Sequence, residues 1–589
     1  MQKSGSLRSH LKEICEQIFS AMNLDKRFGE VFESQRPDLG QFQCNGAMSA
    51  AKEAKKNPRL VAQEFIDKLK ESHPELTLSM AGPGFVNISV SDEFLAEFAN
   101  GLHADKRCGA PENSSPHKVI IDFAGPNLAK PMHVGHLRTS VIGDCLTRIF
   151  RFCGDAVTSD NHLGDFGTQM GMLISELARL HPELPYFDES FSGPYPTTPP
   201  CTINDLEEMY PAVSARCKSD PEQLAQALAA TVEFQLGRLG YIAICKHITD
   251  LSVEELKKDF ALLNISFDTW LGESHYKHRI GPMIESLRKT GLAVESQGAI
   301  VFPLPQEPDR ETPPLLLVKK DGGYLYGTSD LATIEERVSE FGARTILYVV
   351  DKRQSLHFEQ LFAAARLSGI SKHTGLEHIK FGMVNGPDGR PFKTRDGGVM
   401  RLRTLIDEVI NRARDRMNEA GIAKDYPQDE QKIIAFVVGI AALKFADLSN
   451  NRESDYIFDL DKFTSFEGKT GPFILYSAVR IKSILRKAAE QNRTPGAILA
   501  PTGTDRQLLL TLTRLPDVVT SAWRDRMPSY LCEFIFDLAQ SFNRFYAECH
   551  ILKEPDPARA ASWLALCELC LAEFELILTL LGIDIPDRM

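Results

Sequence analysis

The sequence predicts a multidomain α/β protein. A Rossmann-like parallel-sheet domain with an insertion is expected between an N-terminal α+β module and a C-terminal all-α bundle. Three observations support this. The 589 residues exceed the roughly 250–300 at which a single core stops growing. Strand-like and helical apolar patterns alternate from Val119, stop near residue 180 and resume near residue 313. Beyond about residue 402, helical periodicity dominates.

Residues 1–115 are predicted to form the α+β module. Helices are expected near 7–22 and 44–72, where apolar residues recur at helical spacing. A strand is expected over 86–90, because its alternating apolar residues follow a turn rich in glycine and proline. A linker rich in glycine, proline and serine at 109–116 then ends the module.

A strand, a turn and a helix open the central domain. The apolar run Val119–Phe123 is bounded by a loop with glycine and proline, which is typical of a buried strand. Apolar residues from Leu137 to Phe150 then recur at helical spacing, and Pro131 is expected in the first turn, where proline is tolerated. On this assignment His133 and His136 lie on one face of the first turn.

The start of this helix is expected to bind an anion. Its first backbone N–H groups have no partner within the helix, Gly135 lets a phosphate approach the backbone, and Lys130 adds a cation upstream. An H-x-G-H match by itself is explained equally well by ordinary packing. The context favours a site, because a second glycine-containing turn, Asn161–Gly167, follows the next strand-like run. Ligands in open α/β sheets bind at such carboxyl ends of strands.

An insertion is expected to interrupt the central domain at about 181–312. It contains a proline-rich piece and helical stretches around 221–263. The runs 314–318 and 345–350 are predicted to be the returning strands of the parallel sheet, with a helix over 331–341 between them.

These patterns assign residues 116–401 to the central domain and residues 402–589 to the helical bundle. One helix of the bundle carries an apolar stripe from Ile474 to Leu485. Basic side chains lie elsewhere around it, at Arg480, Lys482, Arg486 and Lys487. A solvated face is the simpler explanation of such charges. The alternative is a nucleic-acid surface, on which Tyr476 would stack on an unpaired base.

Composition limits the function classes. The formal net charge of −12 argues against non-specific binding of DNA or RNA by the whole surface. The 12 cysteines lack metal-ligand spacing, which favours free thiols and a cytoplasmic protein. Cys567 and Cys570 lie within an apolar helical pattern and are assigned to core packing. The longest apolar run, Ile433–Leu443, is shorter than the roughly 20 residues of a membrane span, so no membrane anchor is expected.

Two segments carry a family resemblance, Asn127–Arg138 and Asn161–Gln169. Further matches follow in the family's order at Tyr326–Asp330, Gln354 with His357, Phe392–Arg395, Gly471–Phe473 and Ile585–Met589. Over most of its length the sequence resembles class I aminoacyl-tRNA synthetases, specifically arginyl-tRNA synthetases. The resemblance implies ATP-dependent activation of L-arginine to arginyl-adenylate, and transfer to the 2′-hydroxyl of the terminal adenosine of tRNA(Arg). It also implies that the N-terminal module contacts the tRNA elbow and that the bundle binds the anticodon.

The resemblance assigns roles to individual residues. Catalysis is assigned to Lys130, His133, His136, Lys393 and Arg395. Arginine binding is assigned to Asn127, Asn161, Tyr326, Asp330 and Gln354. ATP binding is assigned to His133, Gly135, His136, Gly164 and Lys393, and tRNA binding to Tyr476, Arg480, Lys482, Arg486 and Lys487. Taken alone, Asp330 would be interpreted as the cap of the helix that follows it.

One motif departs from the family pattern. The glycine-rich basic loop Gly386–Gly398 takes the place of the KMSKS loop and suits a lid over pyrophosphate. Thr394 stands where the second lysine is usual. In family members with this departure Lys130 is thought to compensate, and which of Lys130, Lys393 and Arg395 contacts phosphate stays open.

ATP is expected to bring Mg²⁺ with it, because no cage of carboxylates marks a metal site, and no tightly bound cofactor is expected. The resemblance further implies a monomer that needs bound tRNA before it activates arginine. Two alternatives stay open, an adenylate-forming ligase with a small-molecule acceptor and a non-catalytic tRNA-binding relative. P-loop chemistry fails on spacing, because Phe463 stands where the first glycine of a motif ending at Gly468–Thr470 must be.

Overall fold

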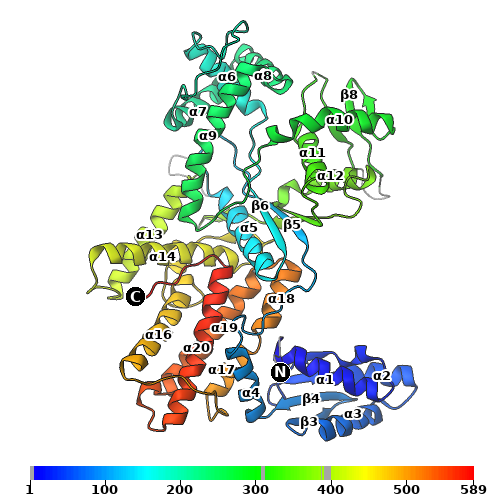
Figure 1. Ribbon diagram of the computed structural model, residues 1–589, viewed down its shortest axis with the longest axis vertical. Coiled ribbons are helices and arrows are strands. Elements are labelled where there is room, and N and C mark those ends of the chain that lie inside the picture. The colour runs from blue at the N-terminus through cyan, green and yellow to red at the C-terminus, as the bar shows by residue number, and fades with distance from the viewer. Residues whose placement is uncertain (1–4, 307–311, 321, 387, 391–399) are drawn as a thin grey trace. The chain divides into compact units, whose positions relative to one another are not determined.

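The computed structural model describes residues 5–306, 312–320, 322–386, 388–390 and 400–589 (Figure 1). The chain forms two compact units. The first combines Met1–Glu112, Arg414–Ala441 and Thr464–Met589. The second combines Asn113–Ala413 with Ala442–Phe463.

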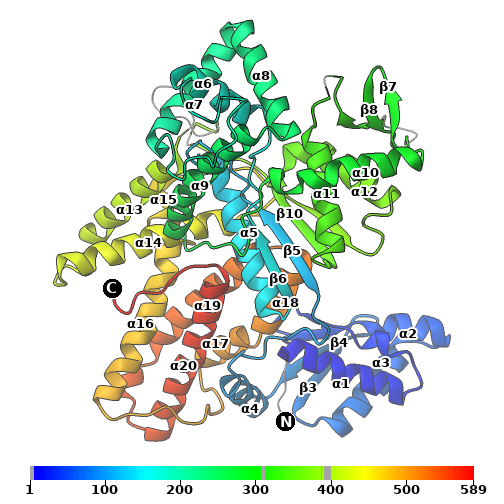
Figure 2. The ribbon, with the colours of Figure 1, turned by 45° about the horizontal axis from the view of Figure 1, so that its top comes forward.

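The N-terminal part of the first unit is an antiparallel sheet with helices packed on it (Figure 2). Its strands, in the order β1-β2-β4-β3, are β1 (Val31–Glu33), β2 (Phe42–Cys44), β4 (Phe85–Val90) and β3 (Leu76–Ala81). Its helices are α1 (Leu7–Ala21), η1 (Lys26–Gly29), α2 (Gly46–Ala54), α3 (Pro58–Ser72) and α4 (Asp92–His103). The predicted helical range 44–72 is two helices, because Lys55 is left-handed at φ 52° and Pro58 opens the second helix.

The C-terminal part of the same unit is helical. It contains α16 (Gly471–Glu490), α17 (Asp505–Leu512), α18 (Leu515–Asp525), α19 (Ser529–Glu548), η4 (Ile551–Lys553) and α20 (Pro557–Leu580). Helix α20 is buried on most sides and includes both Cys567 and Cys570, which confirms their assignment to the core. Among the helices of the described ranges, none is long and apolar enough to cross a membrane.

Charged contacts join the two ends of the chain within this unit. The guanidinium of Arg8 donates two hydrogen bonds of 2.8 Å to the carboxylate of Asp517. Arg506 likewise donates to Asp92 at 2.6 Å. The two bonds from Arg8 to one carboxylate fix orientation as well as distance, and the N-terminal sheet and the C-terminal helices belong to one compact unit.

The second unit is built on a parallel sheet with the strand order β11-β10-β5-β6. These strands are β11 (Gly375–Phe381), β10 (Thr345–Asp351), β5 (Lys118–Phe123) and β6 (Ala156–Asp160). The predicted strands 119–123 and 345–350 are confirmed as neighbours, with Ile121 opposite Leu347. Helix α5 (Gly135–Phe152) follows β5, and α6 (Thr168–Leu180) follows β6. Helix α11 (Tyr326–Ser339) precedes β10, and η3 (Lys352–Gln354) and α12 (Ser355–Leu367) follow it.

The run 314–318 is not a strand of the parallel sheet, so that prediction is wrong. It forms β9 (Leu315–Val318), which pairs with β8 (Ala299–Phe302) in a separate antiparallel sheet, and β7 (Val294–Ser296) pairs with the other edge of β8. A short apolar run indicates a buried strand but carries no information about its partner. The helix predicted over 331–341 begins earlier, at Tyr326.

The segment between α6 and β7 is mostly helical. It contains α7 (Ile203–Ser219), α8 (Pro221–Leu236), α9 (Leu239–Leu262), η2 (Glu273–Tyr276) and α10 (Lys277–Lys289). The remaining elements are β12 (Val384–Asn385), α13 (Leu402–Glu419), α14 (Gln428–Leu448), β13 (Tyr456–Ile457) and α15 (Leu460–Phe463). Each of the 12 cysteines lies in the described ranges and is a free thiol.

Candidate active site

A pocket of about 780 Å³ lies at the carboxyl ends of the parallel strands. Phe123 ends β5, Asp351 ends β10 and Phe381 ends β11, and all three line it. Eight of the residues proposed for arginine or ATP binding also line it: Asn127, His133, Gly135, His136, Gly164, Tyr326, Asp330 and Gln354. Loops that are far apart in the sequence therefore converge on one cavity at the edge where open α/β sheets bind ligands.

The helix beside the pocket begins at Gly135, so Pro131 and His133 precede it instead of lying in its first turn. The reason is tertiary pairing. The N–H of Val134 donates to Met400 O at 3.0 Å, and the N–H of Leu402 donates to Met132 O at 2.8 Å. These bonds hold the segment before the helix in an extended bridge. The apolar face predicted for the helix, from Leu137 to Phe150, is buried as expected.

His133 and His136 nevertheless lie side by side, with ring centroids 4.0 Å apart. The N–H of Gly135 donates to Nδ1 of His133 at 3.0 Å, and the N–H of His133 donates to Nδ1 of His136 at 3.1 Å. Because both Nδ1 atoms accept, each neutral ring carries its proton on Nε2. The pair therefore offers two N–H donors.

Both imidazoles are held neutral. Burial and the charge of Lys130 lower the pKa of His133. Burial, with His133 and Lys130 adding to it, lowers the pKa of His136 to about 3. At neutral pH the two rings are thus hydrogen-bond donors without charge.

Two glycines allow close approaches at the pocket. A Cβ on Gly135 would lie 2.6 Å from Cε1 of His133, so that imidazole packs against the glycine. A Cβ on Gly164 would lie 2.5 Å from Oδ1 of Asn127. The loops after β5 and β6 therefore touch through Asn127 and Gly164, which form an isolated parallel bridge.

Lys130 and Asn161 are not among the residues that line the pocket. The ammonium of Lys130 lies 4.4 Å from the ring centroid of Tyr210, which belongs to α7. Asn161 is fully buried, and its side-chain amide has no hydrogen-bond partner among the described residues. Its backbone N–H donates to Thr269 O at 3.0 Å.

Tyr326 and Asp330 project from the first turns of α11. Because α11 begins at Tyr326, Asp330 lies within the helix, and its interpretation as the cap of a following helix is wrong. Its Oδ2 atom lies 2.7 Å from Nε2 of His357, which lines the pocket from α12. Gln354 lies at the end of η3, directly before α12.

Glu273 is a pocket residue that the sequence analysis missed, because it lies inside the predicted insertion. Its N–H donates to Leu163 O at 3.0 Å, and Gly272 forms a parallel bridge with Leu163. The insertion thus returns to the loop after β6 and delivers a carboxylate. Burial, reinforced by the charges of Asp330 and Asp165, raises the pKa of Glu273 well above its usual range.

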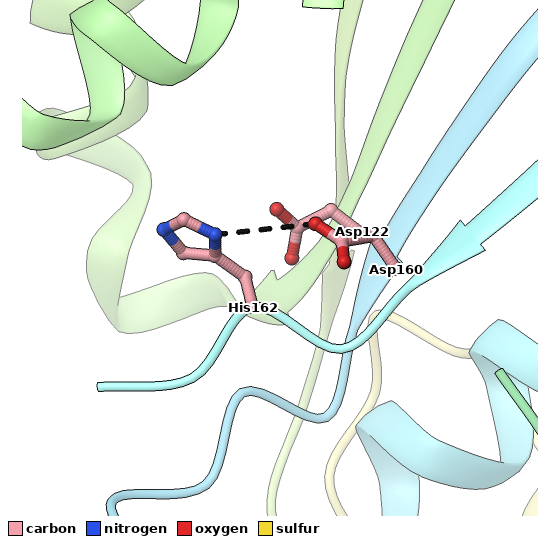
Figure 3. A group of neighbouring side chains, drawn as sticks. All are labelled: Asp122, Asp160 and His162. Carbon is pink, nitrogen blue, oxygen red and sulfur yellow. Dashed lines mark ion pairs between the residues drawn. The ribbon is translucent and has the colours of Figure 1, made fainter. Parts of the chain in front are cut away.

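At the pocket lining, Asp122 and the neighbouring Asp160 share a buried guanidinium. Nη2 of Arg337 lies 2.7 Å from Asp122 and 2.6 Å from Asp160. The imidazole of His162 points toward the same carboxylates, with Nδ1 at 4.0 Å from Asp160 (Figure 3). These three side chains have metal-like spacing, with ligand atoms within 4.8 Å of one another. Since Arg337 already supplies the cation, the cluster is an internal ion pair and gives no support to a metal site.

The loop Gly386–Gly398 lies largely outside the described residues, and Lys393 and Arg395 with it. Its described flanks are both at the pocket. Val384 lines the cavity shortly before the loop. After it, Met400 accepts from the N–H of Val134, next to His133.

The basic helix predicted in the bundle is α16, and its side chains differ in their surroundings. The guanidinium of Arg480 lies 4.7 Å from the ring centroid of Tyr476 and 5.2 Å from that of Tyr546. Lys482 lies 3.6 Å from Asp587, whereas Arg486 and Lys487 are exposed. Tyr476 and Tyr546 are 37% and 42% exposed, so this part of the surface presents aromatic rings beside a cation.

Comparisons with known proteins agree with this arrangement. Residues 98–460 match the family model described as class I tRNA synthetases (R), catalytic domain. Residues 5–90 match the arginyl-tRNA synthetase N-terminal domain, and residues 474–589 match the DALR anticodon-binding domain.

Full-length relatives are similar as well. The chain is 47% identical to the arginine–tRNA ligases of Maricaulis maris and Hyphomonas neptunium, over 99% of this chain and 100% of each relative. The fold resembles the crystal structure of arginyl-tRNA synthetase from Plasmodium falciparum, with a TM-score of 0.79, 24% identity and complete coverage of both chains. The chain belongs to the arginyl-tRNA synthetases of class I.

Proposed function

We propose that this protein is an arginine–tRNA ligase, which activates L-arginine with ATP and transfers it to tRNA(Arg) for protein synthesis. The observation that carries the proposal is a single pocket with two kinds of groups. Its lining includes the neutral N–H donors of His133 and His136 and the carboxyl groups of Asp330 and Glu273. The donors suit a triphosphate, and the carboxylates suit a guanidinium.

Activation requires in-line attack of the arginine carboxylate on the α-phosphate of ATP, with pyrophosphate leaving. Negative charge grows on phosphoryl oxygens during this step, and preorganised N–H donors stabilise it. Nε2 of His133 and of His136 would supply these donors. Mg²⁺ would arrive with ATP as part of the substrate.

Lys393 and Arg395 would provide positive charge to the departing pyrophosphate. Both described flanks of their loop lie at the pocket, which supports a lid over this part of the cavity. Lys130 would act through its positive charge, because its ammonium lies over Tyr210 and it is not among the residues that line the pocket. Gly135 and Gly164 would border the bound nucleotide.

Arginine recognition would use the carboxylate side of the pocket. Asp330 and Glu273 would bind the guanidinium of arginine. Tyr326 would pack on the arginine side chain, and Gln354 would also contact that side chain. Asn127 would hold the backbone end of the amino acid. Asn161 has a buried amide without a described partner, which makes it a candidate to join that contact after a small rearrangement.

The tRNA would be bound by both parts of the first unit. We propose that Tyr476 and Arg480, with Lys482, Arg486 and Lys487, contact the anticodon stem and loop, and that the module 1–115 contacts the elbow. The central domain 116–401, with its insertion at 181–312, would place the terminal adenosine for transfer to its 2′-hydroxyl. The bundle 402–589 has no use in a ligase with a small acceptor, which disfavours that alternative.

We further propose a cytoplasmic monomer that binds no DNA and activates arginine only with tRNA bound. The test of the function is a screen in which purified protein, ATP and total tRNA are incubated with each of the amino acids. The expected result is that tRNA is charged with arginine and with no other amino acid. Charging with another amino acid, or none with any, would overturn the proposal. Pyrophosphate exchange with and without tRNA tests the tRNA requirement, which strong exchange in its absence would refute.

A further inference from the structure

Asp330 and His357 are joined across the wall of the pocket. Nε2 of His357 lies 2.7 Å from Oδ2 of Asp330, and both side chains are more than two-thirds buried. Both line the cavity. The imidazole therefore engages one oxygen of the carboxylate to which the proposed function assigns the arginine guanidinium.

Packing holds the imidazole in this place. A Cβ on Gly327 of α11 would lie only 3.9 Å from Cε1 of His357, so the ring lies against that helix. The ring of Phe358 meets it edge-on, with centroids 5.2 Å apart. The ring of Phe358 in turn lies 4.5 Å from that of His378 on β11, tilted by 32°. The imidazole is thus enclosed by α11, its own helix and the rings that cover β11.

We propose that His357 is a positioning residue for substrate arginine, and that its protonation sets the affinity of the pocket for arginine. The neutral ring donates to Oδ2 of Asp330 and leaves Oδ1 for the guanidinium. The protonated ring places a competing cation on the same carboxylate. This inference rests on the proposed role of Asp330 in binding arginine.

The charge of Asp330 favours the competing form. Burial lowers the pKa of His357, but the hydrogen bond to Asp330 and its negative charge outweigh burial, so the pKa is raised above its ordinary value. A bound guanidinium repels the imidazolium and reverses this effect. Arginine and a proton therefore bind antagonistically, and arginine affinity falls by at most about tenfold per pH unit below that pKa.

Other titratable groups face His357 or its carboxylate partner. They are Tyr326 on α11, Tyr348 and Asp351 on β10, Arg353 on η3, His378 on β11 and Glu273 on η2, whereas the ammonium of Lys352 is bound by Asp455. Strand β9, which also packs on α12, is apolar. Burial lowers the pKa of His378, so this imidazole is neutral at every pH above the ordinary pKa of histidine. Glu273 has a raised pKa and adds its own pH dependence, which a change at His357 leaves in place.

The test is the KM for arginine in aminoacylation at saturating ATP and tRNA, at about pH 6 and about pH 8.5. The wild-type KM is expected to be at least about threefold higher at the lower pH, because His357 gains its proton below a raised pKa. His357→Gln keeps an N–H donor near Nε2 but cannot carry a charge. It should reduce the ratio of the two KM values by at least about threefold, with the effect on the KM for arginine and not on kcat.

Two further variants separate charge from orientation. His357→Ala should also lose pH dependence, and its KM should rise at about pH 8.5 because Oδ2 of Asp330 loses its donor. Recovery of a low KM in His357→Gln then supports positioning. His378→Gln is the matched control, since His378 bonds Val350 O at 3.0 Å and not Asp330, and it should keep the wild-type ratio.

The failure of this inference differs from a failure of the proposed function. A His357→Gln enzyme with the full wild-type ratio, or a His378→Gln enzyme that loses it equally, would overturn the role of His357. Asp330→Asn should raise the KM for arginine at least about tenfold at both pH values. An unchanged KM in Asp330→Asn would instead overturn the arginine site on which the inference rests.

Discussion

The backbone N–H of His133 donates to Nδ1 of His136 at 3.1 Å, and this bond determines which nitrogen of His136 carries the proton. With Nδ1 accepting, the neutral ring has its N–H on Nε2. The second histidine of the H-x-G-H motif is therefore oriented by the backbone of the first. This relationship leads directly to a prediction about the adenylation step.

Replacing His136 by alanine is expected to lower arginine-dependent pyrophosphate exchange about a hundredfold. The reason is that one preorganised donor to a developing negative charge contributes about 3 kcal/mol. Exchange is measured with tRNA present, and tRNA affinity by filter binding should stay within about twofold. His136→Gln, which restores an N–H donor, should recover part of the rate. Full activity in the alanine variant would refute the role assigned to His136.

The pH dependence of ATP binding is expected to lack an imidazole titration. The folded-state pKa of His136 is about 3, and that of His133 is also below its ordinary value. Both rings are therefore neutral in the folded protein above about pH 6.5. The unfolded-state pKa of histidine is about 6.5, so the stability linked to His136 is complete above that pH and is lost progressively as the pH falls toward about 3. The KM for ATP should change less than about twofold between about pH 6.5 and pH 8.5. A titration with a midpoint near pH 7 would be inconsistent with the buried pair.

Glu273→Gln is expected to raise the KM for arginine by about tenfold or more. Burial raises the pKa of Glu273, and a bound guanidinium would lower it again and hold the carboxylate charged. A hydrogen bond to a charged group contributes about 1.5–3 kcal/mol, which the neutral amide cannot supply in full. Steady-state aminoacylation with varied arginine is the measurement. Glu295→Gln, at an exposed position on β7, serves as the control and should leave this KM unchanged. Equal values for both variants would remove Glu273 from the site.

Glu573→Gln is expected to stabilise the protein at neutral pH. Both carboxyl oxygens of Glu573 are buried without a partner among the described residues, and burial raises its pKa well above the usual range. A raised folded-state pKa means that stability is complete below the unfolded-state pKa and declines as the pH rises. Glutamine removes this dependence, so the Tm should rise by about 2–4 °C at pH 7 and little at about pH 4.5.

A matched control for Glu573 exists on the same helix. Glu568 is partly exposed and lies 3.1 Å from Nε2 of His103. Glu568→Gln should bring no increase in Tm, because its carboxylate is solvated and paired. A larger gain at Glu568 than at Glu573 would contradict the assignment of Glu573 as a buried neutral acid.

Arg480→Ala is expected to raise the KM for tRNA about tenfold and to weaken its dependence on salt. The guanidinium lies between the rings of Tyr476 and Tyr546 and donates to Asn543 at 2.7 Å, so its loss removes a cation and loosens two stacking surfaces. The KM for arginine should stay within about twofold. Lys432→Ala, which removes an exposed lysine paired with Asp429, is the control. Identical tRNA kinetics in both variants would exclude Arg480 from the interface.

Local pattern was sufficient for the framework of the site. The strand ending at Phe123 and the apolar face from Leu137 to Phe150 are formed as predicted, since burial and periodicity are properties of neighbouring residues. The pairing of Asp330 with His357 was not predictable from spacing. It depends on how α11 lies against α12, which a separation of 27 residues does not reveal.

The errors share a cause. The start of α5 was placed too early because the bridge between His133 and Arg401 joins residues far apart in sequence. The run 314–318 was assigned to the wrong sheet for the same reason, since a strand's partner is a tertiary property. Glu273 lacks a local signal, and its place in the pocket follows from the contact of its backbone with Leu163.

The contact between Glu273 and Leu163 also bears on how this enzyme tolerates rearrangement of its parts. A designer who cut out residues 181–312 as an optional accessory would remove Glu273 from the lining of the pocket. Chimaeras that exchange this segment between relatives should therefore shift substrate selectivity, even when every residue of the two flanking motifs is left untouched.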